Sequence, residues 1–225
     1  MHGHSSLKVA TRAGAVLWPL ALVFVLSCAL ATNSDDWEKE WNERQPPGEV
    51  MDAVGIVEGM VVAEIGAGRG RYAVQVASRV GPKGKVYAED IDEDALDYVS
   101  FRCTRDGIDN IETILGEVAD PKLPPGSCDF IYCINTYHHI DKPVPLLRNT
   151  ISALKPTGRL VIIEHLPETA RKHGFIGHST PVDTVMAHAK AAGFDFVEQH
   201  SFLEFDEIYV FQVGVTAPST RESDT

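Results

Sequence analysis

Residues 61–70, Val-Val-Ala-Glu-Ile-Gly-Ala-Gly-Arg-Gly, constrain the fold more than any other stretch of this chain. The apolar run is typical of a buried strand in a parallel sheet. Three glycines then stand at alternate positions, where the missing Cβ allows a sharp turn and a close approach to a ligand. Residues 71–80 read as a helix, whose free N–H groups would face that ligand. Together they predict a nucleotide-type site at the carboxyl edge of a doubly wound sheet.

The spacing of the glycines narrows the type of ligand. A dinucleotide fingerprint would require a glycine at position 71, where the chain has Arg71. The pattern from Glu64 to Gly70 instead resembles the first motif of the class I S-adenosylmethionine-dependent methyltransferases. A tight strand-to-helix turn in another α/β protein is the alternative. The resemblance implies that Glu64 orients the loop and that the cofactor lies against Gly66, Ala67, Gly68 and Gly70.

The next predicted strand, residues 85–92, ends in acidic residues. Asp90 follows Gly66 at close to the roughly 20-residue offset at which a carboxylate meets a ribose. A carboxylate suits two vicinal hydroxyls because it accepts two hydrogen bonds at once. Glu89 leaves the register uncertain by one residue, and the resemblance selects Asp90, followed by Ile91, as the ribose contact. Asp92 is better explained as the N-cap of the following helix.

Two further segments resemble the same family. Residues 116–121 follow the third predicted strand, and the resemblance implies that the Val118 amide and the Asp120 side chain contact adenine, with Glu117 as the alternative acceptor. Residues 126–140 resemble the family's fourth strand, with Asn135 at its carboxyl end near the transferred methyl group. Residues 153–163 resemble the turn into strand five, although Thr157 replaces a glycine.

Catalytic residues are harder to identify than cofactor residues. His138 and His139 follow Asn135, so either could act as a general base on an acceptor, and Tyr137 has similar standing. Many family members carry a similar histidine pair without such a role. No histidines have the spacing of a metal site on a helix, so the sequence predicts no metal.

The complete pattern predicts an α/β fold with a seven-stranded sheet in the order 3-2-1-4-5-7-6. The last strand is expected to be antiparallel, with helices between the first five strands and on both faces. A helix after the fifth strand is expected to have Pro181 as its first helical residue and to end at Gly193. We assign residues 59–215 to the methyltransferase domain, 32–58 to an N-terminal helical cap and 216–225 to a flexible tail. Trp37 and Trp41, four residues apart, lie on one helix face, where they either cover the cofactor or pack outside the sheet.

The charge of the chain limits its partners. The 225 residues carry a formal net charge of −12, which argues against a nucleic-acid substrate because phosphate binding requires basic patches. The resemblance implies S-adenosylmethionine as cofactor. Because the sequence shows no basic groove or appended recognition domain, we expect a small-molecule methyl acceptor, with a protein or peptide acceptor in the cell envelope as the alternative. Two alternatives are a non-catalytic binding protein of the same fold in the cell envelope and a NAD-dependent oxidoreductase.

The N-terminus predicts export. Residues 13–31 carry no charge, follow Lys8 and Arg12, and end in the small-x-small sequence Ala29-Leu30-Ala31. This pattern is typical of a signal peptide, and Pro19 interrupts the apolar run. An uncleaved membrane anchor and a lipoprotein signal with Cys28 as acceptor are the alternatives. We expect an exported or membrane-anchored protein, or a cytoplasmic one if this segment is not an export signal.

Overall fold

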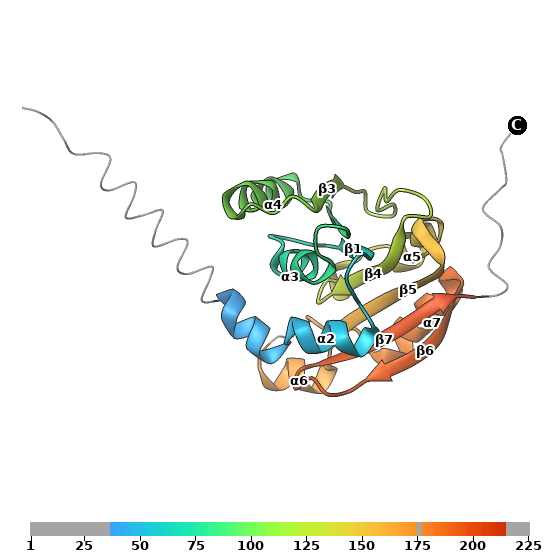
Figure 1. Ribbon diagram of the computed structural model, residues 1–225. Helices are drawn as coiled ribbons and strands as arrows, with labels where there is room; N and C mark the ends of the chain where they lie inside the picture. The colour runs from blue at the N-terminus through green and yellow to red at the C-terminus, as the bar shows by residue number, and fades with distance from the viewer. Residues whose placement is uncertain (1–36, 175–176, 215–225) are drawn as a thin grey trace, which may run out of the picture. The chain divides into compact units, whose positions relative to one another are not determined.

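The computed structural model describes residues 37–174 and 177–214 (Figure 1). The chain divides into two units, residues 1–40 and 41–225. In the first unit only residues 37–40 are described, and they are helical. All features discussed below belong to the second unit. The predicted signal segment 1–31 and the predicted tail 216–225 lie outside the described residues.

The second unit is built on one seven-stranded sheet in the order β3-β2-β1-β4-β5-β7-β6, which confirms the predicted topology. The first five strands run parallel, and β7 is antiparallel to both β5 and β6. The strands are β1 (Val61–Ile65), β2 (Lys85–Asp90), β3 (Ile111–Leu115), β4 (Cys128–Ile134), β5 (Leu154–His165), β6 (Phe194–His200) and β7 (Asp206–Val213).

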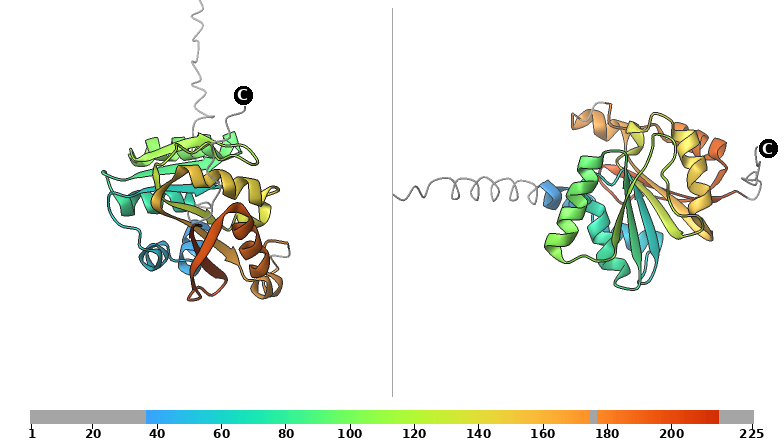
Figure 2. Two further views of the ribbon diagram at one scale, coloured as in Figure 1. Left: turned by 90° about the vertical axis from the view of Figure 1, so that its right-hand side faces the viewer. Right: turned by 90° about the horizontal axis from the view of Figure 1, so that it is seen from above.

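Helices cover both faces of the sheet, as predicted (Figure 2). One face carries α2 (Pro47–Val54), α3 (Arg71–Val80) and α4 (Glu93–Asp106), and the other carries α5 (Pro143–Thr150) and α7 (Val182–Ala192). A short helix, α6 (Pro167–Lys172), follows β5, and a 3-10 turn, η1 (Tyr137–His139), follows β4. The last 3-10 turn, η2 (Ile151–Ala153), leads into β5.

Central strand β4 shows why the sheet needs both layers. Phe130, Tyr132 and Ile134 pack into the core under α2, α3 and α4. Ile131 and Cys133 point the other way, into the core under α5 and α7. Side chains alternate between the faces of a strand, so a strand covered on both sides must be apolar throughout. The apolar run of the fourth strand is therefore explained by its central position in the sheet, where both faces are covered.

Two local predictions were wrong. The prediction of a helix between every pair of the first five strands fails between β3 and β4, where residues 116–127 form a turn with a bridge between Glu117 and Asp120. Pro181 is the N-cap of α7 and not its first helical residue, because its carbonyl accepts the first bond, from the Thr184 amide at 2.9 Å. The predicted end of α7 at Gly193, with φ of 106°, is confirmed.

Residues 41–45 are tied to the sheet through a buried polar network. The Gln45 side-chain amide donates to Asp206 Oδ2 at 3.1 Å, and Arg71 donates to Gln45 Oε1 at 2.7 Å. The other Asp206 oxygen accepts from His165 Nδ1 at 2.5 Å. The Trp41 ring lies 5.7 Å from the His165 ring, at the carboxyl end of β5. The start of this unit is therefore anchored beside the edge where the first strands end.

Across residues 37–174 and 177–214, the structure contains no helix with both the length and the apolar character needed to cross a bilayer.

Candidate functional site

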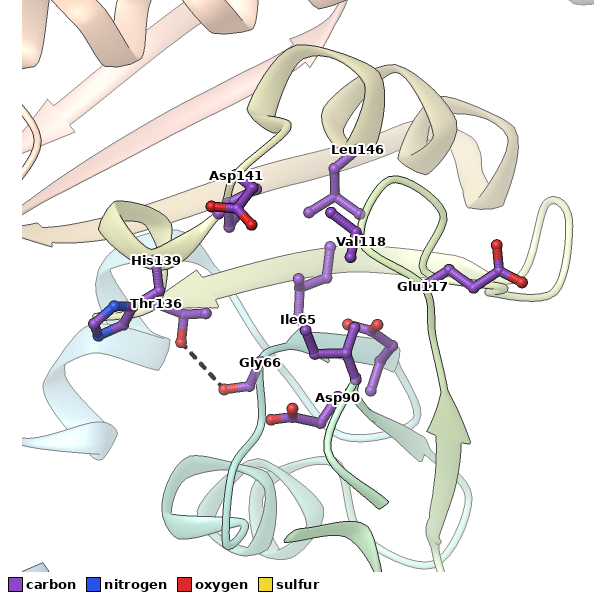
Figure 3. Close-up of a pocket in the computed structure, with 12 residues that line it drawn as sticks. Ile65, Gly66, Asp90, Glu117, Val118, Thr136, His139, Asp141 and Leu146 are labelled. Atoms are coloured by element: carbon purple, nitrogen blue, oxygen red, sulfur yellow. Dashed lines mark hydrogen bonds between the residues drawn. The ribbon is translucent and has the colours of Figure 1, made fainter. Parts of the chain in front are cut away.

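A cavity of about 310 Å³ opens at the carboxyl ends of β1, β2 and β4 (Figure 3). This is the edge at which the sequence predicts the site. Its volume is at the lower end of the range for small-ligand pockets, about 300–1,000 Å³. Residues from four parts of the chain line it: Ile65, Gly66, Glu89, Asp90, Ile91, Glu117, Val118, Thr136, His139, Ile140, Asp141 and Leu146.

The glycine loop begins at the cavity, where Gly66 is a lining residue, whereas Gly68 and Gly70 are not among the lining residues. Gly66, Gly68 and Gly70 have φ of 69°, 52° and 76°, a left-handed conformation that strains any residue with a Cβ. A Cβ on Gly66 would also lie 2.2 Å from Thr136 Cγ2. The Thr136 hydroxyl donates to the Gly66 carbonyl at 3.1 Å, the bond drawn in Figure 3. Gly66 is therefore required both by its backbone angle and by the space around it.

Asp90 connects the end of β2 to this loop. Its Oδ2 accepts from the Gly68 amide at 2.8 Å, and its Oδ1 accepts from the Asp92 amide at 3.0 Å. Because a carboxylate can accept about four hydrogen bonds, the side chain keeps acceptor capacity for a ligand in the cavity. Asp92 itself accepts from the amides of Asp94 and Ala95, which confirms it as the N-cap of α4.

Glu89 is a lining residue that sequence reasoning set aside in favour of Asp90. Its side chain is buried, and burial, reinforced by the neighbouring Asp90 charge, raises its pKa to about 8 despite a hydrogen bond from the Gly66 amide. Glu89 is therefore mostly protonated at neutral pH and can donate a hydrogen bond into the site. The sequence showed that two acids, Glu89 and Asp90, are adjacent, but only the fold shows that their environments differ.

One side of the cavity is apolar, and the loop after β3 contributes Val118 to it. Figure 3 shows Ile65, Val118 and Leu146 gathered there from three different elements. Glu117 also lines the cavity, although its Oε1 lies 3.1 Å from Lys122 Nζ. Asp120 is not among the lining residues, and its carboxylate is held by the amide and ammonium of Lys122 at 2.9 and 3.2 Å. Of the two acids proposed for adenine, Glu117 is the one at the cavity.

Glu64, Ala67 and Asn135, like Gly68 and Gly70, are predicted cofactor residues that are not among the lining residues. Glu64 is buried under the glycine loop, and burial raises its pKa to about 8 although the Ala73 amide and Arg71 favour its charged form. Ala67 is buried and its amide donates to the Glu89 carbonyl at 2.8 Å. Asn135 has a φ of 49°, and its amide donates to Ile163 at 2.9 Å. Their positions indicate roles in shaping the loops, and their contacts with a cofactor stay predictions.

The three catalytic candidates have different surroundings. Tyr137 is buried in the core, its hydroxyl lies 3.1 Å from His188 Nδ1, and burial raises its pKa well above the ordinary range. His138 Nδ1 lies 2.7 Å from Glu164 Oε1. Among these candidates only His139 lines the cavity. Burial and then the nearby imidazoles of His138 and His178 lower the pKa of His139, which favours its neutral form.

His178 is a residue that sequence reasoning did not connect with the site. It comes from the segment before α7, yet its Nδ1 lies 3.3 Å from His138 Nε2, across 40 residues of sequence. No periodicity or short motif links these positions. The tertiary fold brings His178, just before α7, next to His138 in η1.

Comparisons with known proteins agree with this geometry. Residues 56–206 match the family described as a methyltransferase domain. A solved SAM-dependent methyltransferase from Aquifex aeolicus superposes with a TM-score of 0.67 at 26% identity, covering 74% of this chain and 89% of that one.

Two curated relatives match this chain over only about half of their own length. Nocamycin O-methyltransferase of Saccharothrix syringae is 28% identical over 147 residues, covering 64% of this chain and 52% of that protein. Demethylmenaquinone methyltransferase of Listeria monocytogenes is 25% identical over 116 residues, covering 52% of this chain and 49% of that protein. The chain spans about half the length of these curated relatives. Because the family match covers more than half of the chain, the protein belongs to the methyltransferase domain family, with the class I, seven-stranded fold that the resemblance predicted.

Proposed function

We propose that this protein transfers a methyl group from S-adenosylmethionine to a small-molecule acceptor. The observation that carries this proposal is the juxtaposition of Gly66, Asp90 and Val118 around one cavity at the carboxyl edge of the sheet. These residues come from three separate loops, each of which independently resembles a cofactor motif of the family. The relatives' names support methyl transfer to small molecules as the reaction class.

The lining residues suit the parts of such a cofactor. The glycine loop allows close approach of the methionyl part, and the Asp90 carboxylate can accept from both ribose hydroxyls. Ile65, Val118 and Leu146 offer an apolar slot for the adenine ring. Protonated Glu89 can donate to a ring nitrogen, which an ionised carboxylate could not do.

The chemistry requires little of the protein beyond placement. The cofactor's sulfonium supplies an electrophilic methyl group, and an acceptor atom displaces the sulfur in line. The cavity residues hold the two reactants in contact and exclude water, which accounts for much of the rate in such reactions. His139 lies at the cavity wall with its neutral form favoured, and it is the residue positioned to remove a proton from the acceptor.

The test is turnover with methyl-labelled S-adenosylmethionine and a panel of small phenols, thiols, amines and carbon acids. Formation of labelled product together with S-adenosylhomocysteine by the wild-type protein, and its loss in Asp90→Ala, supports the proposal. Cofactor binding without turnover on any acceptor class would favour the non-catalytic binding protein.

We also propose that residues 1–31 direct export of the protein. The proposal rests on the sequence pattern alone, because this segment lies outside the described residues. Sequencing the N-terminus of the mature protein tests it. A new terminus at Thr32 indicates a cleaved signal, and an intact Met1 in the cytoplasmic fraction would contradict export.

A further inference from the structure

We propose that His138, His139 and His178 bind one divalent transition-metal ion of the zinc class at the rim of the cavity. Each imidazole offers one nitrogen, and these three nitrogens lie within 4.8 Å of one another. The rings of His138 and His139 are 4.2 Å apart between centroids, and the His178 ring is 5.2 Å from each of them. Three imidazoles are therefore gathered around one point, from two segments of the chain.

One nitrogen–nitrogen separation in this cluster matches the separation of two ligands on one metal ion. His138 Nε2 and His178 Nδ1 lie 3.3 Å apart. Two nitrogens bound to tetrahedral zinc at about 2.0–2.1 Å are separated by roughly 3.4 Å. His139 and His178 are exposed, so their side chains can adjust by a rotation to complete the triangle.

A buried carboxylate orients the central ligand. Glu164 is 1% exposed, and its Oε1 lies 2.7 Å from His138 Nδ1. A carboxylate only accepts, so we assign the Nδ1 proton to His138, and Nε2 then keeps its lone pair toward His178 and His139. This is the carboxylate–histidine–metal arrangement that fixes the tautomer of metal-bound histidines in other proteins.

The same carboxylate gives an independent reason for a cation here. Its second oxygen, Oε2, is buried and has no hydrogen-bond partner among the described residues. A carboxylate removed from water is costly unless a positive charge compensates it. A divalent ion bound to Nε2 of His138 would supply that positive charge, with the His138 imidazole lying between the ion and Glu164.

The donor set selects the kind of metal. Three nitrogen ligands suit Zn²⁺ and its neighbours in the transition series, whereas Mg²⁺ and Ca²⁺ prefer oxygen ligands. Three protein ligands also leave a fourth position open, as in catalytic zinc sites. His139 belongs to both the cluster and the cavity lining, so the open position is next to the space for the acceptor.

One consequence rests on the proposed function. With the ion bound, the lone pair of His139 is used as a ligand, so the ion takes the place of His139 as the group that activates the acceptor. An acceptor hydroxyl bound at the open position would release its proton to solvent more readily, because the ion lowers the pKa of that hydroxyl. The acceptor oxygen then forms the bond to the methyl carbon while the carbon–sulfur bond breaks and S-adenosylhomocysteine leaves. The metal site itself does not depend on this step.

The site can be tested without any cofactor. The full-length protein is stripped of metal with a chelator and then titrated with Zn²⁺ to measure how many equivalents it binds. We expect the wild type to bind one more equivalent than His178→Ala or His139→Ala, both exposed positions that should not affect folding. His2 and His4 supply the same background in every variant. His173→Gln is the matched control, because His173 packs against Phe205 outside the cluster and should leave the extra equivalent intact.

Two further readouts make the test specific. Co²⁺ in the wild type should give the strong visible absorption of a four-coordinate ion, and His178→Ala should lose it. Glu164→Gln should weaken Zn²⁺ binding about 10–100-fold. Equal Zn²⁺ stoichiometry and equal Co²⁺ spectra in the wild type and His178→Ala would overturn the site. If the ion binds but its removal leaves turnover unchanged, the acceptor-activation step is overturned and the site remains.

Discussion

The hydroxyl of Thr136 donates to the carbonyl of Gly66 at 3.1 Å, joining the ends of β4 and β1 across 70 residues of sequence. This contact holds the glycine loop against the end of β4 and closes one wall of the cavity. It brings the Thr136 methyl group so near that position 66 has no room for a side chain. The packing of β4 beside β1 therefore requires glycine at position 66, the start of the glycine loop.

Gly66→Ala should therefore abolish cofactor binding. The added Cβ would meet Thr136 Cγ2 at 2.2 Å, in addition to the strain of a φ of 69°. Gly107→Ala is the matched control, since Gly107 has a φ of 67° but nothing within 4 Å of the new Cβ. That control should lose about 1–2 kcal/mol of stability from backbone strain alone and bind the cofactor normally. Calorimetric titration of both variants measures the difference, and equal affinities would contradict this role of Gly66.

Glu64 should make the fold less stable as pH rises. Burial raises its folded-state pKa from 4.5 to about 8, so the folded state holds this proton more tightly than the unfolded chain. The stabilisation is complete below the unfolded pKa and is lost as pH rises through the folded pKa. Glu64→Gln removes the ionisation, so its melting temperature should gain on the wild type between pH 5 and pH 9. Parallel melting curves for the two proteins over this range would count against a buried acid with a raised pKa.

Asp206→Ala should destabilise the protein by about 3–5 kcal/mol, as expected when one partner of a buried ionic network is removed. Asp206 is fully buried and accepts from both His165 and Gln45. The control is Asp52→Ala, which breaks an ion pair between Asp52 and Arg79 with side chains 68% and 29% exposed. That change should cost at most about 1 kcal/mol. Chemical denaturation of the two variants compares them, and similar losses would show that the Asp206 network contributes little.

Tyr137→Phe should leave turnover unchanged. The Tyr137 hydroxyl points to His188 in the core and does not line the cavity. The variant should lose about 0.5–1.5 kcal/mol of stability, the usual contribution of one hydrogen bond. Steady-state kinetics of the folded variant checks this, and a large fall in kcat with unchanged stability would return Tyr137 to the catalytic candidates.

The sequence predicted the parts of the site that depend on local pattern. The glycine loop, the acid at the end of β2 and the cap at Asp92 each follow from residues within one strand, turn and helix. The different environments of Glu89 and Asp90 could not be read, because they arise from burial against the loop after β3 and the glycine loop. The absence of a helix between β3 and β4 was also missed, because residues 116–127 connect these strands through a turn that contains the Glu117–Asp120 bridge.

The cluster of three histidines was beyond sequence reasoning for a related reason. His138 and His139 are adjacent, but His178 reaches them only through the fold of the segment after β5. Metal-site patterns in a sequence depend on fixed short spacings, and this cluster has none. Glu164, which orients His138, was likewise hidden inside an apolar strand.

The most direct test of the central claim is calorimetric titration of the full-length protein with S-adenosylmethionine, S-adenosylhomocysteine and NAD. We predict that the first two bind and NAD does not. Asp90→Ala should weaken both by about 1–3 kcal/mol, since it removes the carboxylate at the ribose. Asp92→Ala, the neighbouring N-cap, should lower stability by about 1 kcal/mol and leave affinity unchanged. Binding of NAD, or no binding of either methionine-derived ligand, would contradict the assignment of this cavity to the methyl donor.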